Sequence, residues 1–105
     1  MAEDVRFTYQ FDWDPVKARS NLADHGVSFQ LATTVFSDAL ALTVYDEEHS
    51  ENEERWATLG QAESGQHLVV IHTFEQPSPT EARIRVISAR TATKREIQDY
   101  EETPR

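Results

Sequence analysis

Aromatic and polar residues alternate along the first part of the chain. From Phe7 to Trp13 every second position is aromatic, and the positions between them carry Thr, Gln or Asp. A period of two is typical of a β-strand that buries one face. The pattern therefore predicts a half-buried strand over residues 5–13.

Two helices are predicted after this strand. The first covers 15–25, because Asp14 can cap its first turn, Pro15 suits its first position and Gly26 follows its last turn. The second begins after Ser28, where apolar residues recur at spacings of three and four and so share one helical face. These residues are Phe29, Ala32, Val35 and Phe36. We expect both helices to cover a sheet.

The remaining apolar segments predict strands joined by short connections, which is typical of an antiparallel meander. The segment 67–74 is the most apolar of them. Within 39–45 every second residue is expected to face inward: Leu40, Leu42 and Val44. The predicted strands are 39–45, 55–59, 67–74 and 83–90, joined by an acidic loop over 46–54, a turn over 60–65 and a loop around Pro77-Ser78-Pro79.

A short helix is predicted at the end of the chain. Thr93 and Glu96 have the spacing of a capping box, and Ile97 and Tyr100 would lie on the packing face of the helix. Two helices near the start, followed by antiparallel strands, predict an α+β fold with the helices packed on one face of the sheet. A length of 105 residues fits a single domain over 1–105.

Composition narrows the classes of function. The chain has no cysteine, which excludes a thiolate nucleophile and cysteine-ligated zinc. No cofactor or metal is expected, since the acidic cluster around His49 lacks a spaced ligand signature. No window approaches the roughly eighteen apolar residues that span a bilayer. We therefore expect a cytoplasmic protein that does not contact membranes.

Charge is unevenly distributed along the chain. The net charge is −9, which argues against a general affinity for nucleic acid. Six carboxylates gather in 46–54, whereas the segment 83–95 is locally basic. An acidic body with one basic patch suits a protein that meets a phosphate at one site, or one that binds a basic partner.

The segment 83–90 concentrates arginine residues. On a strand, Arg83 and Arg85 share one face while Ile84 and Val86 take the other, and Arg90 lies near the end. Guanidinium groups bind phosphate bidentately and stabilise negative charge in a transition state. The alternative is that these arginines are solvated or paired with surface carboxylates.

Several motifs occur in order between residues 11 and 100. They are Phe11-Asp12-Trp13-Asp14-Pro15 with Lys17 and Asn21, His25-Gly26-Val27-Ser28-Phe29, Glu53-Glu54-Arg55, and Ile84-Arg85-Val86-Ile87-Ser88-Ala89-Arg90 with Ala92-Thr93 and Glu96. In these motifs the chain resembles the BrnT toxins. It departs from them in a longer loop over 75–82 and in Ala39, where a proline is common.

The resemblance implies a RelE-like fold and a bacterial type II toxin that acts as a ribonuclease. It also implies neutralisation by a BrnA-type antitoxin that carries a DNA-binding domain, so that operator DNA is met only through the antitoxin. Metal-independent RNA cleavage needs a base for the 2′-hydroxyl, cations for the phosphorane and an acid for the leaving oxygen.

The candidate catalytic residues combine this chemistry with the motif positions. Arg85 and Arg90 are expected to hold the phosphate, although Arg90 has a structural alternative as a partner of Glu96 or Glu54. Glu54 is a candidate base or a solvated loop carboxylate. His25 is a candidate acid or base, or a cation favoured by the helix dipole. Candidate RNA-binding residues are Lys17, Arg83, Lys94 and Arg95. His72 and Tyr100 are expected in the core.

Two functions remain open at this point. The first is an endoribonuclease of the mRNA-interferase type that inhibits translation and growth. The second is a catalytically inactive binding module that serves as the antitoxin's partner and co-regulates operator binding, which the acidic net charge would favour.

Overall fold

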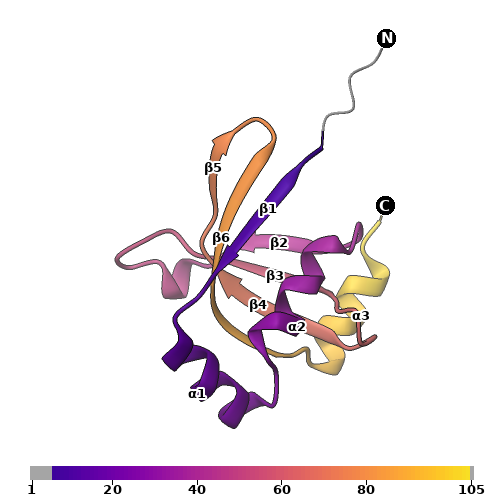
Figure 1. Cartoon of the computed structure of the whole chain (residues 1–105). Helices are drawn as coiled ribbons and strands as arrows, with labels where there is room; N and C mark the ends of the chain where they lie inside the picture. The colour runs from indigo at the N-terminus through magenta and orange to yellow at the C-terminus, as the bar shows by residue number, and fades with distance from the viewer. Residues whose placement is uncertain (1–5, 105) are drawn as a thin grey trace.

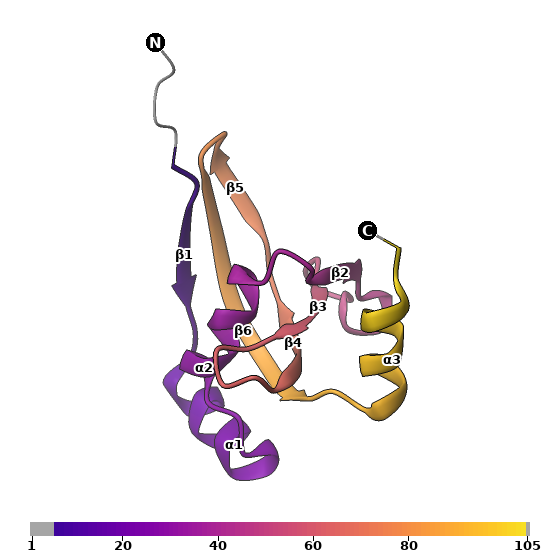
Figure 2. The ribbon, with the colours of Figure 1, turned by 90° about the vertical axis from the view of Figure 1, so that its right-hand side faces the viewer.

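A mixed six-stranded β-sheet organises the chain, with α2 on one side of β4 and α3 on the other (Figures 1 and 2). The computed structural model describes residues 6–104. In chain order the elements are β1 (Thr8–Asp12), α1 (Pro15–His25), α2 (Phe29–Thr33), the 3-10 turn η1 (Thr34–Ser37), β2 (Leu42–Tyr45), the 3-10 turn η2 (Glu47–His49), β3 (Trp56–Gln61), β4 (His67–His72), β5 (Glu75–Ser78), β6 (Glu81–Thr91) and α3 (Lys94–Glu102).

The predicted caps define where α1 and α2 begin and end. The Asp14 carboxylate accepts a hydrogen bond from the Val16 amide at 2.9 Å, and Gly26 ends α1 with a φ of 69°, a conformation that glycine adopts without strain. The Ser28 hydroxyl accepts from the Leu31 amide at 3.0 Å. α2 is shorter than its apolar pattern, because the backbone tightens into η1 after Thr33.

The core lies between α2 with η1 and the central strands of the sheet. Phe29, Ala32 and Val35 are completely buried there, as the helical spacing predicts. They pack in one cluster with β4 and β6, and burial of each large side chain stabilises the fold by about 1.5–3 kcal/mol. The strand residues of the cluster are Leu68, Val70, Ile84, Val86 and Ala89.

A buried polar side chain ties α1 to β6. The Asn21 amide nitrogen donates hydrogen bonds to the carbonyl oxygens of Val27 at 2.9 Å and Ala89 at 2.8 Å. Its amide oxygen accepts from the Ala89 amide at 3.0 Å. These three bonds fix the position of the last turn of α1, and therefore of His25, relative to the end of β6.

Strand directions differ in one place from the predicted meander. The sheet order is β1-β6-β4-β3-β2, with β5 paired to β6, and β1 runs parallel to β6. The expectation of a purely antiparallel sheet is therefore wrong at β1. Hydrophobic periodicity reports which face of a strand is buried and carries no information on the direction of its partner, so the sequence pattern could not reveal this pairing.

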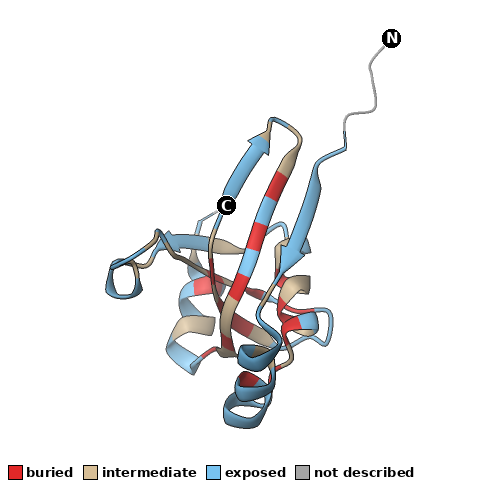
Figure 3. Cartoon of the chain, turned by 60° about the vertical axis from the view of Figure 1, so that its left-hand side comes forward, coloured by how far each residue is buried: buried red, intermediate tan, exposed pale blue. Residues whose placement is uncertain are grey.

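Two predicted apolar faces are more exposed than expected. All five residues of β1 are exposed (Figure 3), so the prediction of a half-buried first strand is wrong for the observed segment. Val5 lies outside the described residues. The strand predicted over 39–45 begins only at Leu42, and Leu40 and Val44 are exposed rather than inward. β1 and β2 are the two edges of the sheet, where the packing that covers inner strands is missing.

The loop predicted around Pro77-Ser78-Pro79 is largely a strand. β5 pairs antiparallel with β6 through Glu75 opposite Arg83 and Ser78 opposite Glu81. Proline disfavours an inner strand because it cannot donate a ladder hydrogen bond, but an outer strand tolerates it. The resulting hairpin extends away from the helices (Figure 1).

A β-bulge interrupts the pairing of β6 with β4. Ser88 lies opposite Ile71, whereas the next pair joins His72 to Val86, so Ile87 is the extra residue. A bulge shifts the alternation of side chains by one position. Buried residues accordingly follow the pattern Ala82, Ile84 and Val86 before the bulge and Ala89 after it.

The predicted C-terminal helix forms with its capping box. The Thr93 hydroxyl accepts from the Glu96 amide at 3.1 Å, and the Thr93 amide donates to the Glu96 carboxylate at 2.9 Å. Tyr100 is buried, as expected, and its hydroxyl donates to Asp38 at 2.6 Å. Within residues 6–104, no helix has the length and apolar character to cross a membrane.

Candidate active site on the arginine face

The bulge in β6 brings three arginines to one face of the sheet. Arg83 and Arg85 lie opposite the buried Ile84 and Val86, as the alternation predicts. A spacing of five residues would put Arg90 on the other face of a regular strand. The extra residue in the bulge returns Arg90 to the exposed side, opposite Ala89. We call this side of the sheet the arginine face.

A cleft of about 430 Å³ occupies the arginine face near the end of β6. His25 from α1, Arg55 before β3, Arg90 from β6 and Glu96 from α3 all line it. The cleft therefore gathers groups that are separated by up to 71 positions in the chain. Its floor is formed by outward-facing residues of the sheet, including Ala57, Ile71 and Ser88.

A smaller pocket of about 240 Å³ adjoins this cleft. Lys17, Arg55 and Arg85 line it together with the carboxylates of Asp14 and Glu53. Arg55 lines both spaces, so it connects the site of Arg85 with the site of Arg90. We call the two spaces together the groove. Its cations are Lys17, Arg55, Arg85 and Arg90, and carboxylates lie among them: Asp14, Asp46, Glu48, Glu53 and Glu96.

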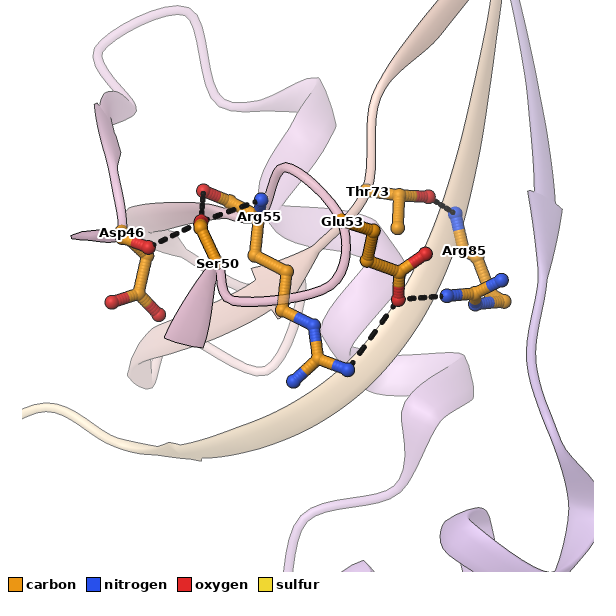
Figure 4. Close-up of polar contacts among 6 residues, drawn as sticks. All are labelled: Asp46, Ser50, Glu53, Arg55, Thr73 and Arg85. Atoms are coloured by element: carbon orange, nitrogen blue, oxygen red, sulfur yellow. Dashed lines mark hydrogen bonds and ion pairs between the residues drawn. The ribbon is translucent and has the colours of Figure 1, made fainter. Parts of the chain in front are cut away.

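Glu53, rather than the predicted Glu54, is the carboxylate at Arg85. Its side chain forms an ion pair with Arg85 and accepts a second hydrogen bond from Arg55 at 3.4 Å (Figure 4). The hydrogen bond from Arg85 holds the pKa of the Glu53 carboxyl below its usual value. Glu54 is exposed and, within residues 6–104, makes no side-chain hydrogen bond or ion pair.

Arg55 is a site residue that the sequence reasoning missed. The Ser50 hydroxyl accepts from the Arg55 amide at 3.0 Å and donates to the Asp46 carbonyl, which anchors the arginine at the end of the acidic loop (Figure 4). Its Nε atom is buried and lacks a hydrogen-bond partner among the described residues. The signal was available, because Glu53 and Arg55 are two positions apart and share one side of an extended chain.

Thr73, the residue after β4, forms hydrogen bonds with the backbone of Arg85. The Arg85 amide donates to the Thr73 hydroxyl at 3.2 Å (Figure 4). The Arg85 carbonyl accepts from the Thr73 amide at 3.0 Å. These bonds fix the backbone that carries the guanidinium, while the side chain remains 45% exposed. A ligand in the groove can therefore reach Arg85.

Arg90 forms a bidentate ion pair with Glu96. Its two terminal nitrogens donate to the two carboxylate oxygens at 2.7 and 2.9 Å. This hydrogen bonding lowers the pKa of the Glu96 carboxyl to about 2 and raises the pKa of Arg90. Arg90 therefore has the structural role of a partner of Glu96, and its side chain also lines the cleft.

His25 reaches the same cleft from the last turn of α1. Within residues 6–104, its imidazole makes no hydrogen bond to another group, so both ring nitrogens can serve a ligand. An imidazole can act as an acid or a base. His25 and Arg90, which are 65 positions apart in the chain, are therefore brought together by the fold.

The candidate RNA-binding residues are divided between the groove and its surroundings. Lys17 lines the smaller pocket beside Arg85. Arg83 lies farther along the arginine face, 4.0 Å from Glu75. Lys94 and Arg95 form the exposed first turn of α3, where Arg95 pairs with Asp99 at 3.4 Å. The structure thus brings Lys17 to the catalytic candidates and leaves the other three outside the groove.

Two other histidines, His72 and His49, have polar partners, and His49 also lines the cleft. His72 is buried and bonds through Nε2 to the Thr58 hydroxyl at 2.7 Å and through Nδ1 to the Thr73 carbonyl at 2.8 Å, and burial lowers its pKa. It is a core histidine, as expected. His49 pairs with Asp46 at 2.8 Å. Across residues 6–104, no group of three or more His, Asp or Glu side chains is arranged to hold a metal ion.

Comparison with known proteins defines the class. A family profile described as the ribonuclease toxin, BrnT, of type II toxin-antitoxin systems matches residues 13–96. The chain is therefore a toxin of a type II toxin-antitoxin system, of the ribonuclease class. It belongs to the BrnT family, which confirms the resemblance drawn from the motifs.

A solved structure supports this assignment. The crystal structure of the Brucella abortus ribonuclease toxin BrnT is similar to this chain, with a TM-score of 0.58 and 25% sequence identity. The similarity covers 83% of this chain and 100% of the Brucella chain. No curated protein sequence matches. The α+β fold with a mixed sheet is thus shared with a BrnT toxin.

Proposed function

We propose that this chain is a metal-independent endoribonuclease that cleaves RNA in the groove of the arginine face. The observation that carries the proposal is the convergence of Arg55, Arg85 and Arg90 with His25 on this face. Cleavage of mRNA in the bacterial cytoplasm would inhibit translation and growth. We further propose that the activity is of the mRNA-interferase type and that the fold is RelE-like, as the motif resemblance implies.

The chemistry needs no group beyond these side chains. The 2′-oxygen of RNA attacks the adjacent phosphorus while the bond from phosphorus to the 5′-oxygen breaks, which gives a 2′,3′-cyclic phosphate and a 5′-hydroxyl. The phosphorane carries extra negative charge, and guanidinium groups stabilise such charge best where water is partly excluded. Arg55 and Arg85 are proposed to hold the reacting phosphate, with Arg90 at the adjoining position.

Proton transfer is assigned to His25. An imidazole can accept the 2′-hydroxyl proton or donate one to the leaving 5′-oxygen. Glu53 is a weak base in the free protein, because its pKa is lowered by Arg85. A phosphate that takes over Arg85 would release this carboxylate, so Glu53 is the second candidate for proton transfer, in preference to the exposed Glu54.

The surrounding cations are proposed to hold the flanking RNA. Lys17 lies at the catalytic groove, while Arg83, Lys94 and Arg95 would contact more distant phosphates. Because the whole chain carries a charge of −9, binding must depend on these local cations. We propose that a BrnA-type antitoxin with a DNA-binding domain neutralises the toxin.

A second candidate function is an inactive module that only binds the antitoxin. It is favoured by the two ion pairs that the arginines already form, Arg85 with Glu53 and Arg90 with Glu96. A phosphate must displace at least the first of them before it can bind bidentately. The two functions differ in whether purified protein cleaves RNA.

The test is cleavage of a single-stranded RNA by purified protein in buffer with EDTA. We expect cleavage with 2′,3′-cyclic phosphate ends, and a loss of about tenfold or more in rate for Arg85→Ala and Arg55→Ala. Arg19→Ala is the matched control, because Arg19 is exposed on α1 and lines neither space of the groove. Equal rates in folded variants and wild type would refute the site, and no cleavage by any of them would favour the inactive module.

A further inference from the structure

An aromatic ladder formed by β1 and the residue before it lies exposed on the side of the sheet opposite the arginine face. Phe7, Tyr9 and Phe11 are 48%, 41% and 36% exposed. Their rings contact one another in sequence, with centroids 5.2 Å apart between Phe7 and Tyr9 and 5.8 Å apart between Tyr9 and Phe11. Such a contiguous exposed apolar patch marks an interaction surface more often than chance exposure does.

An apolar groove of about 350 Å³ runs beside this ladder. Tyr9, Phe36, Trp56 and Phe74 line it, and no carboxylate, lysine or arginine does. Phe36 from η1 supports the ladder, with its ring 6.0 Å from Tyr9 and 5.5 Å from Phe11. Phe74, two residues after the end of β4, is also exposed.

β1 is also an edge strand with a free side. It stands at the end of the sheet order, and no strand within residues 6–104 pairs with its outer edge. Its register with β6 aligns Tyr9 with Ala82 and Phe11 with Ile84 on the apolar side. Gln10 aligns with Arg83 and Asp12 with Arg85, on the arginine face. An added strand would thus contact both faces through alternate side chains.

The size and charge of this surface indicate what kind of partner binds to it. A patch of this kind offers a few hundred Å² at most, less than the roughly 800 Å² per partner of a stable globular interface. A second copy would bring a further charge of −9 against the first. An extended segment needs less area, because it gains backbone hydrogen bonds along the edge. It brings only a few acidic groups instead of a whole acidic domain, and these would reach across β1 toward Arg83 and Arg85.

We propose that an extended segment of the antitoxin adds to the free edge of β1. Its apolar side chains pack on Phe7, Tyr9 and Phe11, and its alternating acidic side chains reach the arginine face. The segment would compete with the RNA phosphate for Arg85 while it is anchored on the opposite side of the sheet. The inference rests on the proposed antitoxin partnership and adds the surface and the chemistry of the segment.

The experiment measures binding of a full-length BrnA-type antitoxin, by titration calorimetry, to wild type and to Tyr9→Ser. We expect Tyr9→Ser to bind at least tenfold more weakly, as truncation of a central interface aromatic does. Val16→Ser is the matched control, since Val16 is 58% exposed on α1 and belongs to neither β1 nor the lining of the apolar groove, so its substitution should leave affinity unchanged. Hydrogen exchange should slow at the β1 amides in the complex.

Other occupants give different results. Affinity that is equal for Tyr9→Ser and wild type, or protection confined to residues 46–54, would overturn the proposal. A wild-type dimer that Tyr9→Ser dissociates, seen by light scattering at several concentrations, would identify a second copy as the occupant and overturn it too. The ribonuclease rate of Tyr9→Ser without antitoxin is measured in parallel and should equal that of wild type. The binding assay thus tests the proposed antitoxin surface, and the ribonuclease assay tests the proposed catalytic site separately.

Discussion

Replacing Asn21 by alanine should destabilise the protein by about 3 kcal/mol. The side chain makes three hydrogen bonds of 2.8–3.0 Å in a buried setting, two as donor and one as acceptor. Alanine leaves the Val27 and Ala89 carbonyls and the Ala89 amide without these partners. Each bond contributes about 0.5–1.5 kcal/mol, and a buried group left unsatisfied costs about 1–3 kcal/mol, so three groups give roughly this total even after partial relaxation.

Urea unfolding at 25 °C measures this change in the free energy of unfolding. With a typical slope of about 2 kcal/mol per molar urea, the midpoint should fall by roughly 1.5 M. Leu22→Ala is the control, because Leu22 is the neighbouring residue on α1 and is 53% exposed. We expect its effect to remain within about 0.5 kcal/mol. A loss below about 1 kcal/mol for Asn21→Ala would refute the reasoning that these bonds hold α1, and with it His25, against β6.

Two further predictions concern the ion pair beside the cleft and the packing of β3. The folded pKa of Glu96 is about 2 against an ordinary value of 4.5, so its pairing with Arg90 stabilises the fold above pH 4.5 and is lost as the pH falls from 4.5 toward 2. Because the Arg90 side chain is 44% exposed, solvent screening reduces the contribution of this ion pair to about 1 kcal/mol. Between pH 4.5 and 2, the free energy of unfolding of Glu96→Gln should therefore fall by about 1 kcal/mol less than that of wild type. An equal fall in both proteins would contradict the pairing. Gly60→Ala should lower the free energy of unfolding by about 1–3 kcal/mol, because the added Cβ would lie 3.1 Å from the Ala41 Cβ and 3.2 Å from the Val35 Cβ. A melting temperature within about 2 °C of wild type would contradict this prediction and show that these neighbours move aside.

The helices and the inner strands follow directly from local signals in the sequence. Asp14, Gly26 and the Thr93–Glu96 capping box act within one turn of their own helices, so their roles can be recognised without knowledge of the fold. The alternation of Arg83 and Arg85 with Ile84 and Val86 is equally local. These elements were predicted because their physical causes lie close together in the chain.

The features that assemble the site depend on contacts between distant segments. The bulge at Ile87, which turns Arg90 to the same face as Arg85, arises from pairing with β4 and has no signature in β6 itself. The choice of Glu53 over Glu54 depends on where the acidic loop meets β6, 32 positions later. The exposure of β1 depends on its place at the edge of the sheet. Hydrophobic periodicity predicts which face of an element is buried, whereas the residues that contact that face are determined by the tertiary structure.

The most direct measurement of the central claim is growth of bacteria that produce this chain without an antitoxin, with wild type beside Arg85→Ala at matched soluble levels. Total RNA from both cultures is examined for fragments. Arg85→Ala is suited to this comparison because its side chain is 45% exposed and its removal leaves the backbone bonds to Thr73 in place. We expect growth arrest and RNA fragmentation with wild type, and normal growth with intact RNA for the variant. Normal growth with wild type, or equal RNA loss in both cultures, would contradict it.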